Sequence, residues 1–346
     1  MTELRAPDLT DVLSRYAIDT PRVTEKLSSG IVNDNWLVTD SGGGRYILRA
    51  YRRVRDPERV LFQLRFQDYL REQGYPTAEV IGTADGEPFL TFAGMPWALF
   101  LVVEGQEFDF TRLPQAAEAG RRLAEFHEIT VGYDGPVAHV TAGEVDFSAL
   151  DAPPSSHTWS NSVLGEKHAE HLGRLFPGPE YAGDLGFFSD WRRRAAATWP
   201  NDRSAALPRA WLHCDYHGRN MLFRDDEMVG LFDFDFVTPG PRVFDVARGF
   251  FNFGREKRGS RVIRDDFCRA FLNGYETRTP LTDEERGSLG FMAVLNWCPD
   301  AAFYEGRLPE EGAERIAERL RFDVIMMRAL DAEIRRLAPE FGWAVV

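Results

Sequence analysis

The chain has 346 residues, of which 44% are hydrophobic and 27% charged, and its formal net charge at pH 7 is −13. This length and composition are ordinary for a globular protein of two domains or lobes. The excess of 54 acidic over 41 basic residues argues against nucleic acid or an anionic membrane as the main partner. We therefore expect a small polar partner, with a slight preference for a cationic one.

Three scattered cysteines, Cys214, Cys268 and Cys298, form neither a disulfide framework nor a CxxC metal pair. The first residues lack the basic start and apolar core of a signal peptide, and no apolar run is long enough to span a bilayer. We expect a cytoplasmic protein.

The first third of the chain predicts a sheet with one long helix. A helical pattern covers residues 8–17, and alternating apolar and polar residues predict strands over 22–27, 35–39 and 45–51. Asp56-Pro57 opens a helix that Gly74 closes. Strands follow over 79–83, 88–92 and 97–103, and the last is apolar enough to be buried on both faces. The expected buried face of the helix consists of Val60, Leu61, Leu64, Tyr69 and Leu70.

The remainder of the chain is mostly helical in pattern. Helices are predicted over 113–128, 187–199, 244–253, 262–275, 283–296 and 310–337, whereas residues 131–180 give no clear order. His127 ends an apolar helix face and is interpreted as structural. His168 and His171 have the spacing of a metal pair, but without a third ligand a solvated helix face is the better interpretation. We expect a first lobe over 1–104, a connector near 101–105 and a second lobe over 105–346.

The stretch from Trp211 to Val237 carries the chemistry. An apolar run enters the loop His213-Cys-Asp-Tyr-His217, and Asn220 precedes a second apolar run. A third run ends in Asp233-Phe-Asp235. Carboxylates and a carboxamide at strand ends suit a hard cation such as Mg²⁺. A transition-metal site would need a further His or Cys cluster, which the flanking sequence lacks.

Phosphoryl transfer uses these same residue types. One aspartate orients the acceptor hydroxyl and takes its proton, while an asparagine and a second aspartate hold Mg²⁺ on the nucleotide phosphates. The kinase pattern H-R-D-L-x-x-x-N followed by D-F-G has the spacing of His213, Asp215, Asn220 and the later Asp233-Phe234. Three matched positions and the downstream Asp-Phe make this pattern specific.

The block resembles the aminoglycoside phosphotransferase and choline kinase family, the small-molecule relatives of the protein kinases. The family motif reads roughly H-G-D-x-H-x-x-N, then an apolar strand ending in D-F-[DE], then a helix that starts D-[LIV]-A. The resemblance covers most of the chain. It implies an α+β, two-lobed protein-kinase-like fold, with a five-stranded antiparallel sheet and a helix before a mostly helical lobe. The run Gly230-Leu-Phe-Asp-Phe-Asp-Phe236 is most similar to homoserine-kinase-like members.

Matched positions carry the family's roles over to this chain. Asp215 would be the catalytic base, and Asn220 and Asp233 would hold Mg²⁺. Asp235, two residues after Asp233 and on the same strand face, would assist the metal. The resemblance also gives His213 a supporting role in the loop.

The same resemblance places His217 within reach of the transferring phosphate and Asp245 as a brace of the catalytic loop. The connector would meet adenine through the backbone of Leu101, Val102 and Val103. The polar loop before the second strand would cover the phosphates, through Ser28, Ser29, Gly30, Asn33 and Asn35.

One position departs from the family. Kinases hold the α- and β-phosphates with a lysine on the third strand, paired with a glutamate on the next helix. The third strand here has no lysine, and Arg49 is the natural substitute because it keeps the charge and offers a bidentate fork. The helix partner aligns with Gln63, with Glu58 as the alternative.

The sequence thus predicts transfer of the γ-phosphoryl group of ATP, or of GTP, to a hydroxyl of a small polar acceptor. The acceptor classes left open are aminoglycosides, amino sugars, amino alcohols and homoserine-like amino acids. Residues 296–300 and 303–305 could enclose an amine, although a core Trp and a helix-capping Asp are the simpler interpretation. Two alternatives remain: a non-catalytic nucleotide-binding protein, and a protein Ser/Thr kinase, which the short segment between Asp233 and Asp245 disfavours.

Overall fold

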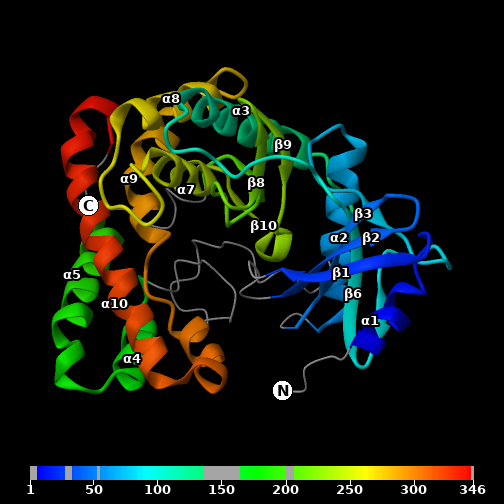
Figure 1. Cartoon of the computed structure of the whole chain (residues 1–346). Coiled ribbons are helices and arrows are strands. Elements are labelled where there is room, and N and C mark those ends of the chain that lie inside the picture. The colour runs from blue at the N-terminus through cyan, green and yellow to red at the C-terminus, as the bar shows by residue number, and fades with distance from the viewer. Residues whose placement is uncertain (1–5, 28–32, 53–54, 136–163, 199–205, 344–346) are drawn as a thin grey trace. The chain divides into compact units, whose positions relative to one another are not determined.

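The computed structural model describes residues 6–27, 33–52, 55–135, 164–198 and 206–343 (Figure 1). The chain divides into two compact units. The first comprises Met1–Glu107, Gly132–Thr141 and Met221–Asp235, and the second comprises Phe108–Val131, Ala142–Asn220 and Phe236–Val346. No helix of the described residues is long and apolar enough to cross a membrane.

The first unit contains an antiparallel sheet in the order β1-β2-β3-β6-β4, with β5 also paired to β6. The predicted antiparallel sheet is present, with six strands in the described residues rather than five, because both β4 and β5 pair with β6. A separate hairpin, β8–β9, belongs to the same unit. The strands are β1 (Pro21–Leu27), β2 (Asp34–Asp40), β3 (Arg45–Ala50), β4 (Val80–Ile81), β5 (Leu90–Phe92), β6 (Met95–Leu101), β8 (Met221–Arg224) and β9 (Glu227–Leu231).

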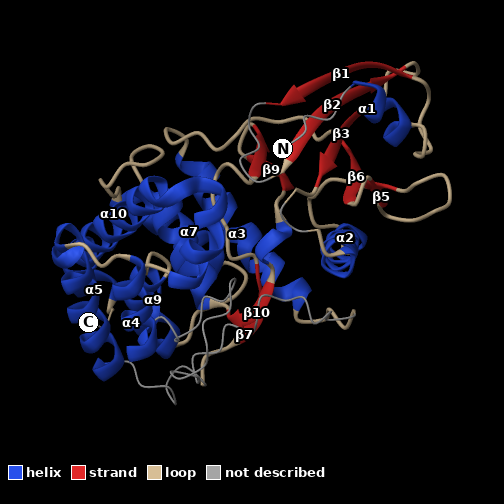
Figure 2. Cartoon of the chain, turned by 90° about the horizontal axis from the view of Figure 1, so that it is seen from below, coloured by secondary structure: helices blue, strands red, loops and turns tan. Residues whose placement is uncertain are grey.

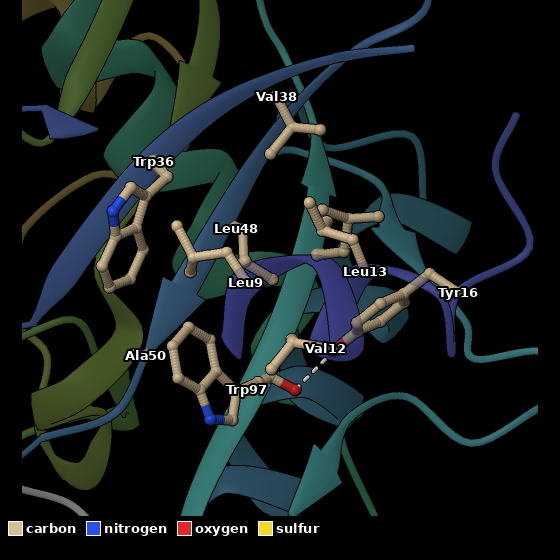
Figure 3. Close-up of a cluster of buried hydrophobic side chains, with 10 residues drawn as sticks. Leu9, Val12, Leu13, Tyr16, Trp36, Val38, Leu48, Ala50 and Trp97 are labelled. Atoms are coloured by element: carbon tan, nitrogen blue, oxygen red, sulfur yellow. Dashed lines mark hydrogen bonds between the residues drawn. The ribbon is translucent and has the colours of Figure 1, made fainter. Parts of the chain in front are cut away.

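One face of this sheet is covered by α1 (Ala6–Leu13), whose apolar side chains point toward the strands (Figure 3). Trp36 of β2 and Trp97 of β6 stack with ring centroids 5.4 Å apart. The Tyr16 hydroxyl donates a hydrogen bond of 2.7 Å to the Trp97 carbonyl, so the polar end of this buried ring is satisfied. The alternating burial of β2 follows the two-residue period of a strand.

Helix α2 (Pro57–Glu72) begins as predicted, with the Asp56 side chain accepting a hydrogen bond from the Glu58 backbone N–H. Its predicted buried face is too narrow. Leu61 and Tyr69 are only half-buried, because the helix packs on two sides, against the sheet and against Tyr133. The buried residues are Val60, Phe62, Gln63, Leu64, Phe66, Gln67 and Leu70.

The connector after β6 packs closely on the β8–β9 hairpin. A Cβ atom at Gly105 would lie 2.9 Å from the Leu222 Cβ and 3.0 Å from the Phe223 carbonyl oxygen, so no larger residue fits without a shift. Gln106 and Phe223 exchange backbone hydrogen bonds of 2.8 Å. The hairpin that leads to Asp233 is therefore fixed to the strands that carry Arg49.

The second unit is mostly helical, as predicted, and also contains the strand pair β7–β10 (Figure 2). Helices α3 and α8 lie side by side, and a Cβ at Gly120 would meet the Phe271 carbonyl oxygen at 1.9 Å. Helix α10 starts earlier than predicted and contains a non-helical Gly312. The elements are α3 (Leu113–Thr130), α4 (Glu166–Leu175), α5 (Ala182–Thr198), β7 (Arg209–Leu212), β10 (Thr238–Pro241), α7 (Val243–Gly254), α8 (Asp265–Glu276), α9 (Asp283–Leu295) and α10 (Ala301–Phe341).

Candidate active site

The loop after β7 is held by a buried carboxylate on α7. Asp245 lies in the first turn of this helix and is fully buried. Its two oxygens accept hydrogen bonds from the backbone N–H groups of His213 (2.5 Å) and Cys214 (2.9 Å). Cys214 has a φ of 60°, a left-handed conformation that non-glycine residues adopt only when their surroundings impose it. Asp245 therefore braces the loop, as expected.

His213 is also fully buried, and its Nδ1 accepts a hydrogen bond of 3.2 Å from the Asp215 backbone N–H. The imidazole contacts the rings of Phe126 and Tyr216 edge to face. A histidine in this position fixes the backbone next to Asp215 and supports the loop rather than contacting a ligand.

The Asp215 carboxylate has polar partners on both oxygens. Its Oδ1 accepts a hydrogen bond of 2.6 Å from the Arg248 Nη2. Its Oδ2 lies 3.0 Å from the Asn220 Nδ2 and 3.3 Å from the His217 Nε2. Burial alone would raise the pKa of this carboxyl, but Arg248 and then His217 hold the pKa of Asp215 well below its usual range. The group is an oriented carboxylate at neutral pH.

Arg248 was not singled out by the sequence analysis. It lies on α7 three residues after Asp245 and is half-buried, next to buried residues that are nearly all apolar. An arginine in such an apolar stretch could have been singled out from the sequence, because a cation that is partly removed from water needs a partner. That partner, Asp215, is far away in sequence, and only the packing of α7 against the loop reveals it.

The first unit brings a second group of charged residues together around Arg49. The Arg49 Nε donates a hydrogen bond of 3.3 Å to the Asn35 Oδ1, its register partner on β2. The Arg49 Nη1 lies 3.9 Å from an Asp233 oxygen and 4.0 Å from an Asp235 oxygen. Burial lowers the pKa of Arg49, but Asp233 and then Tyr51 and Asp235 outweigh it and raise the pKa above its usual value. The predicted Arg49, Asn35 and both aspartates therefore cluster within this unit.

The predicted location of Asp235 on a strand is wrong. Asp233 follows β9 with a φ of 67°, and Phe234–Phe236 form a 3₁₀ turn, so strand alternation ends before Asp235. The Asp235 side chain is buried and accepts a hydrogen bond of 3.2 Å from the Asn33 Nδ2. It thus points into the first unit, next to the predicted residue Asn33.

The helix partner expected for Arg49 differs from both alternatives. Glu58 is exposed and Gln63 is buried, and within the described chain neither side chain bonds to Arg49. The α2 residue that reaches the Asp-Phe-Asp segment is Arg59, whose Nη2 donates a hydrogen bond of 2.9 Å to the Asp235 carbonyl. In this chain the counter-charges of Arg49 come from the segment after β9.

Two backbone N–H groups of the connector already donate hydrogen bonds within the protein. The Leu101 N–H donates to the Glu79 carbonyl (2.9 Å) and the Val102 N–H to the Arg45 carbonyl (3.0 Å). The Val103 side chain packs with Ile47 and Phe232 around a small apolar cluster.

A family model described as the phosphotransferase enzyme family matches residues 23–281. The chain belongs to this family. A homoserine kinase of Caulobacter vibrioides is 28% identical over 296 residues, which cover 84% of this chain and 84% of that enzyme. A homoserine kinase of Phenylobacterium zucineum is 26% identical over 348 residues, covering 96% and 99%.

Among solved structures, an amicoumacin kinase in complex with AMP-PNP and Ca²⁺ matches with a TM-score of 0.67 at 14% identity, covering 94% of each chain. This match supports the fold alone. The family recognised from the sequence and its α+β fold are confirmed, and the chain is a kinase that acts on a hydroxyl group.

Other candidate residues have structural roles or lie outside the described chain. Ser28, Ser29 and Gly30 of the predicted phosphate loop are outside the described residues. The His127 Nδ1 is 2.9 Å from the Tyr275 hydroxyl and its Nε2 is 3.6 Å from Asp245, so this histidine is part of the core, as predicted.

The structure does not support a metal site at His168 and His171. The prediction that His168 lies on a solvated helix face is wrong. His168 is buried and its Nε2 is 2.8 Å from the Pro299 carbonyl, while burial lowers the pKa of His168 to about 4. His171 lies 3.3 Å from Glu305. Asp300 caps α10 through the Ala302 and Phe303 N–H groups, as in the simpler of the two interpretations. Among the described residues, no group of three or more His, Cys, Asp or Glu could hold a metal ion.

Proposed function

We propose that this kinase transfers the γ-phosphoryl group of ATP to a hydroxyl of a small polar acceptor, with Asp215 as the base. The observation that carries the proposal is the Asp215 carboxylate, whose orientation is fixed by Arg248, Asn220 and His217 before any ligand binds. Catalysis of phosphoryl transfer depends on such positioning and on charge stabilisation.

The low pKa of Asp215 defines how the base works. A carboxylate that is a weak proton acceptor orients the acceptor hydroxyl through a hydrogen bond before the reaction. As the bond from the hydroxyl oxygen to the γ-phosphorus forms and the bond from that phosphorus to the ADP oxygen breaks, the hydroxyl proton passes to Asp215. His217, hydrogen-bonded to the same carboxylate, is proposed to face the transferring phosphate.

A divalent cation fits the residues proposed to hold it. The Asn220 amide nitrogen donates to Asp215, which leaves its amide oxygen as the ligand atom. Asn220 directly precedes β8, whose first residue Met221 pairs with Leu231 shortly before Asp233. Amide and carboxylate oxygens are ligands that Mg²⁺ accepts, and we assign Asn220 and Asp233 to it, assisted by Asp235. When bound, Mg²⁺ would neutralise charge on the phosphates.

The first unit is proposed to bind the nucleotide. Arg49 would contact the phosphates as a substitute for the usual lysine, and Asn33 and Asn35 would lie beside them with the loop that contains Ser28, Ser29 and Gly30. Adenine would pack on the apolar cluster of Ile47, Val103 and Phe232. We propose ATP and a divalent cation as the cofactors, by analogy with the AMP-PNP and Ca²⁺ complex of the amicoumacin kinase, with GTP as the alternative.

Among the acceptor classes, a homoserine-like hydroxy amino acid is favoured, because the two curated relatives described above are homoserine kinases. Amino alcohols, amino sugars and aminoglycosides remain the alternatives. The lobe boundary at residue 104 and a cytoplasmic location stay predictions.

The test is turnover by the purified protein with Mg-ATP and a panel of hydroxylated amino acids, amino alcohols and amino sugars. We expect ADP release and a phosphorylated product with one class, and a loss of about 10³-fold in Asp215→Asn. Asp283→Asn, an exposed first-turn residue of α9, is the matched control and should stay within about twofold. A folded protein with no Asp215-dependent ADP release would instead support a non-catalytic nucleotide-binding protein.

A further inference from the structure

One face of α7 runs beside the catalytic loop. Arg248, Asn252 and Arg255 are spaced by four and three residues, which places them on the same side of a helix. Arg248 bonds to the Asp215 carboxylate, and the Asn252 Nδ2 donates to the Tyr216 carbonyl at 3.1 Å. Arg255 continues this face at the helix end, beyond the two residues that hold the loop.

Arg255 is buried, and no hydrogen-bond acceptor among the described residues meets two of its guanidinium nitrogens. Its exposed fraction is 6%, and in the described chain neither its Nε nor its Nη2 has a hydrogen-bond partner. Its guanidinium carbon lies 5.1 Å from the centre of the Trp297 ring. The N–H groups of a guanidinium point outward in its own plane, so a ring stacked on its face does not accept their hydrogen bonds. Burial and then repulsion from Arg248 lower the pKa of Arg255 to about 10. A buried cation of this kind is costly unless something pairs with it.

The group is continuous with the residues around Asp215. Trp297 follows Asn296, whose side-chain oxygen accepts a hydrogen bond of 3.2 Å from the Arg248 Nη1. Seven residues of helix advance about 10 Å along its axis, and the two guanidinium groups are near enough for Arg248 to affect the pKa of Arg255. The unpaired cation therefore lies close to the residues that hold Asp215.

The segment that begins at Arg255 is basic in an acidic protein. Residues 255–264 contain five arginines or lysines and one acidic residue, Glu256, whereas the whole chain has a net charge of −13. Lys257, Arg258 and Arg261 of this segment are exposed. Such a local excess of positive charge attracts anions collectively, and each exposed, screened side chain contributes little to it.

We propose that Arg255 binds a carboxylate of the acceptor and is the residue that selects acidic acceptors over neutral or purely cationic ones. A planar guanidinium donates two parallel hydrogen bonds to a carboxylate, which would satisfy the buried Nε and Nη2 together. The inference rests on the proposed function and replaces the amine enclosure expected from residues 296–305, since Asp300 caps a helix and Trp297 faces an arginine.

Three acceptor molecules separate the contributions of the amine and the carboxylate of a hydroxy amino acid. L-Homoserine carries hydroxyl, amine and carboxylate, 3-aminopropan-1-ol lacks the carboxylate, and 4-hydroxybutanoate lacks the amine. With the wild-type protein we expect kcat/KM for L-homoserine to exceed that for 3-aminopropan-1-ol by at least about 100-fold. The 4-hydroxybutanoate anion should inhibit or react, whereas 3-aminopropan-1-ol at the same concentration should react only slowly and should not inhibit.

The variant Arg255→Gln should raise the KM for L-homoserine by about 10- to 100-fold. The KM for ATP and the activity with 3-aminopropan-1-ol should remain unchanged. Arg258→Gln removes an exposed arginine of the same segment and is the matched control, expected within about twofold. The melting temperature gives an independent readout. If Arg255 serves binding, Arg255→Met should leave the melting temperature of the ligand-free protein unchanged or raise it. If Arg255 serves stability instead, Arg255→Met should lower the melting temperature.

The inference is overturned if 3-aminopropan-1-ol is as good an acceptor as L-homoserine, a result that needs no variant and stands even if Arg255→Gln does not fold. It is also overturned if Arg255→Gln behaves like Arg258→Gln. A wild-type protein that phosphorylates no acceptor in the wider panel would instead count against the proposed function, so the two failures are distinguishable.

Discussion

The two groups of predicted catalytic residues hold their charges differently. In the second unit, Asp215 has three side-chain partners at 2.6, 3.0 and 3.3 Å. In the first unit, Arg49 faces Asp233 and Asp235 at 3.9 and 4.0 Å, too far for hydrogen bonds. The Asp215 carboxylate is thus oriented by close side-chain partners, whereas the ion pairs of Arg49 are long. Under the proposed function, we expect the close contacts of Asp215 to support the chemical step and the longer contacts of Arg49 to leave it able to bind phosphate.

We expect the largest effect from removing Asp245, whose carboxylate holds the backbone of the loop that contains Asp215. Asp245→Ala leaves two buried backbone N–H groups without their acceptor, and we expect a loss of about 3–5 kcal/mol in the free energy of unfolding. Activity should be lost with it. Urea unfolding measures the change. Asp190→Ala, which removes an exposed partner of Arg193, should change stability by less than about 0.5 kcal/mol, and a similarly small loss for Asp245→Ala would contradict the role of the brace.

Arg49→Ala tests the other side of the comparison. Because the ion pairs of Arg49 are long, stability should change little, whereas kcat/KM for ATP should fall about 10²- to 10³-fold. Arg49→Lys keeps the charge and should recover part of the loss. The control is Arg45→Ala on the same strand, whose side chain pairs with the exposed Glu104. Steady-state kinetics decides, and wild-type values in Arg49→Ala would mean that the phosphate contact is elsewhere.

The Asp323 carboxyl of the second unit sharpens the comparison, because in the part of the chain that the structure describes no salt bridge holds it. Asp323 accepts a hydrogen bond of 2.5 Å from the Tyr304 hydroxyl, and burial raises the pKa of Asp323 to about 7 despite Tyr304 and Arg319, with Asp300 adding to the rise. The native state therefore binds the proton more tightly than the unfolded chain, so stability should fall as pH rises from about 4 to 7 and then level off.

Asp323→Asn should remove this part of the pH dependence. The difference in melting temperature between pH 5 and pH 8 should shrink by roughly 2–6 °C relative to the wild type. Differential scanning calorimetry at the two pH values measures it. An unchanged difference would show that Asp323 is ionised throughout this range.

Sequence patterns could predict the family because the residue types and intervals of its motif, Asp215, Asn220 and Asp233, are fixed in the sequence, while the catalytic roles of these residues stay predictions. They could not predict Arg248, which reaches Asp215 only through the packing of α7. The strand assignment of Asp235 failed for a local reason, since the left-handed φ of Asp233 ends the alternation. The partners of Arg49 were not predicted, because the family pattern pairs a lysine at this position with a glutamate on the next helix. An arginine side chain differs from a lysine in length and geometry.

The same limits apply to the histidines and to the long helix of the first unit. His168 sits on an amphipathic helix that looked solvated, yet it is buried against a carbonyl from a distant segment. The buried face of α2 is wider than one stripe, because Tyr133 covers a second side. Periodicity reports that a helix has a buried face, but not how many neighbours cover it.

The most direct test of the central claim is ³¹P NMR of the purified protein with Mg-ATP and L-homoserine. We expect a new phosphomonoester resonance that grows as ADP appears with the wild type and is absent with Asp215→Asn. Equal product formation by both proteins would contradict Asp215 as the base. No phosphomonoester from any hydroxylated acceptor, in a protein that still binds ATP, would contradict the catalytic assignment.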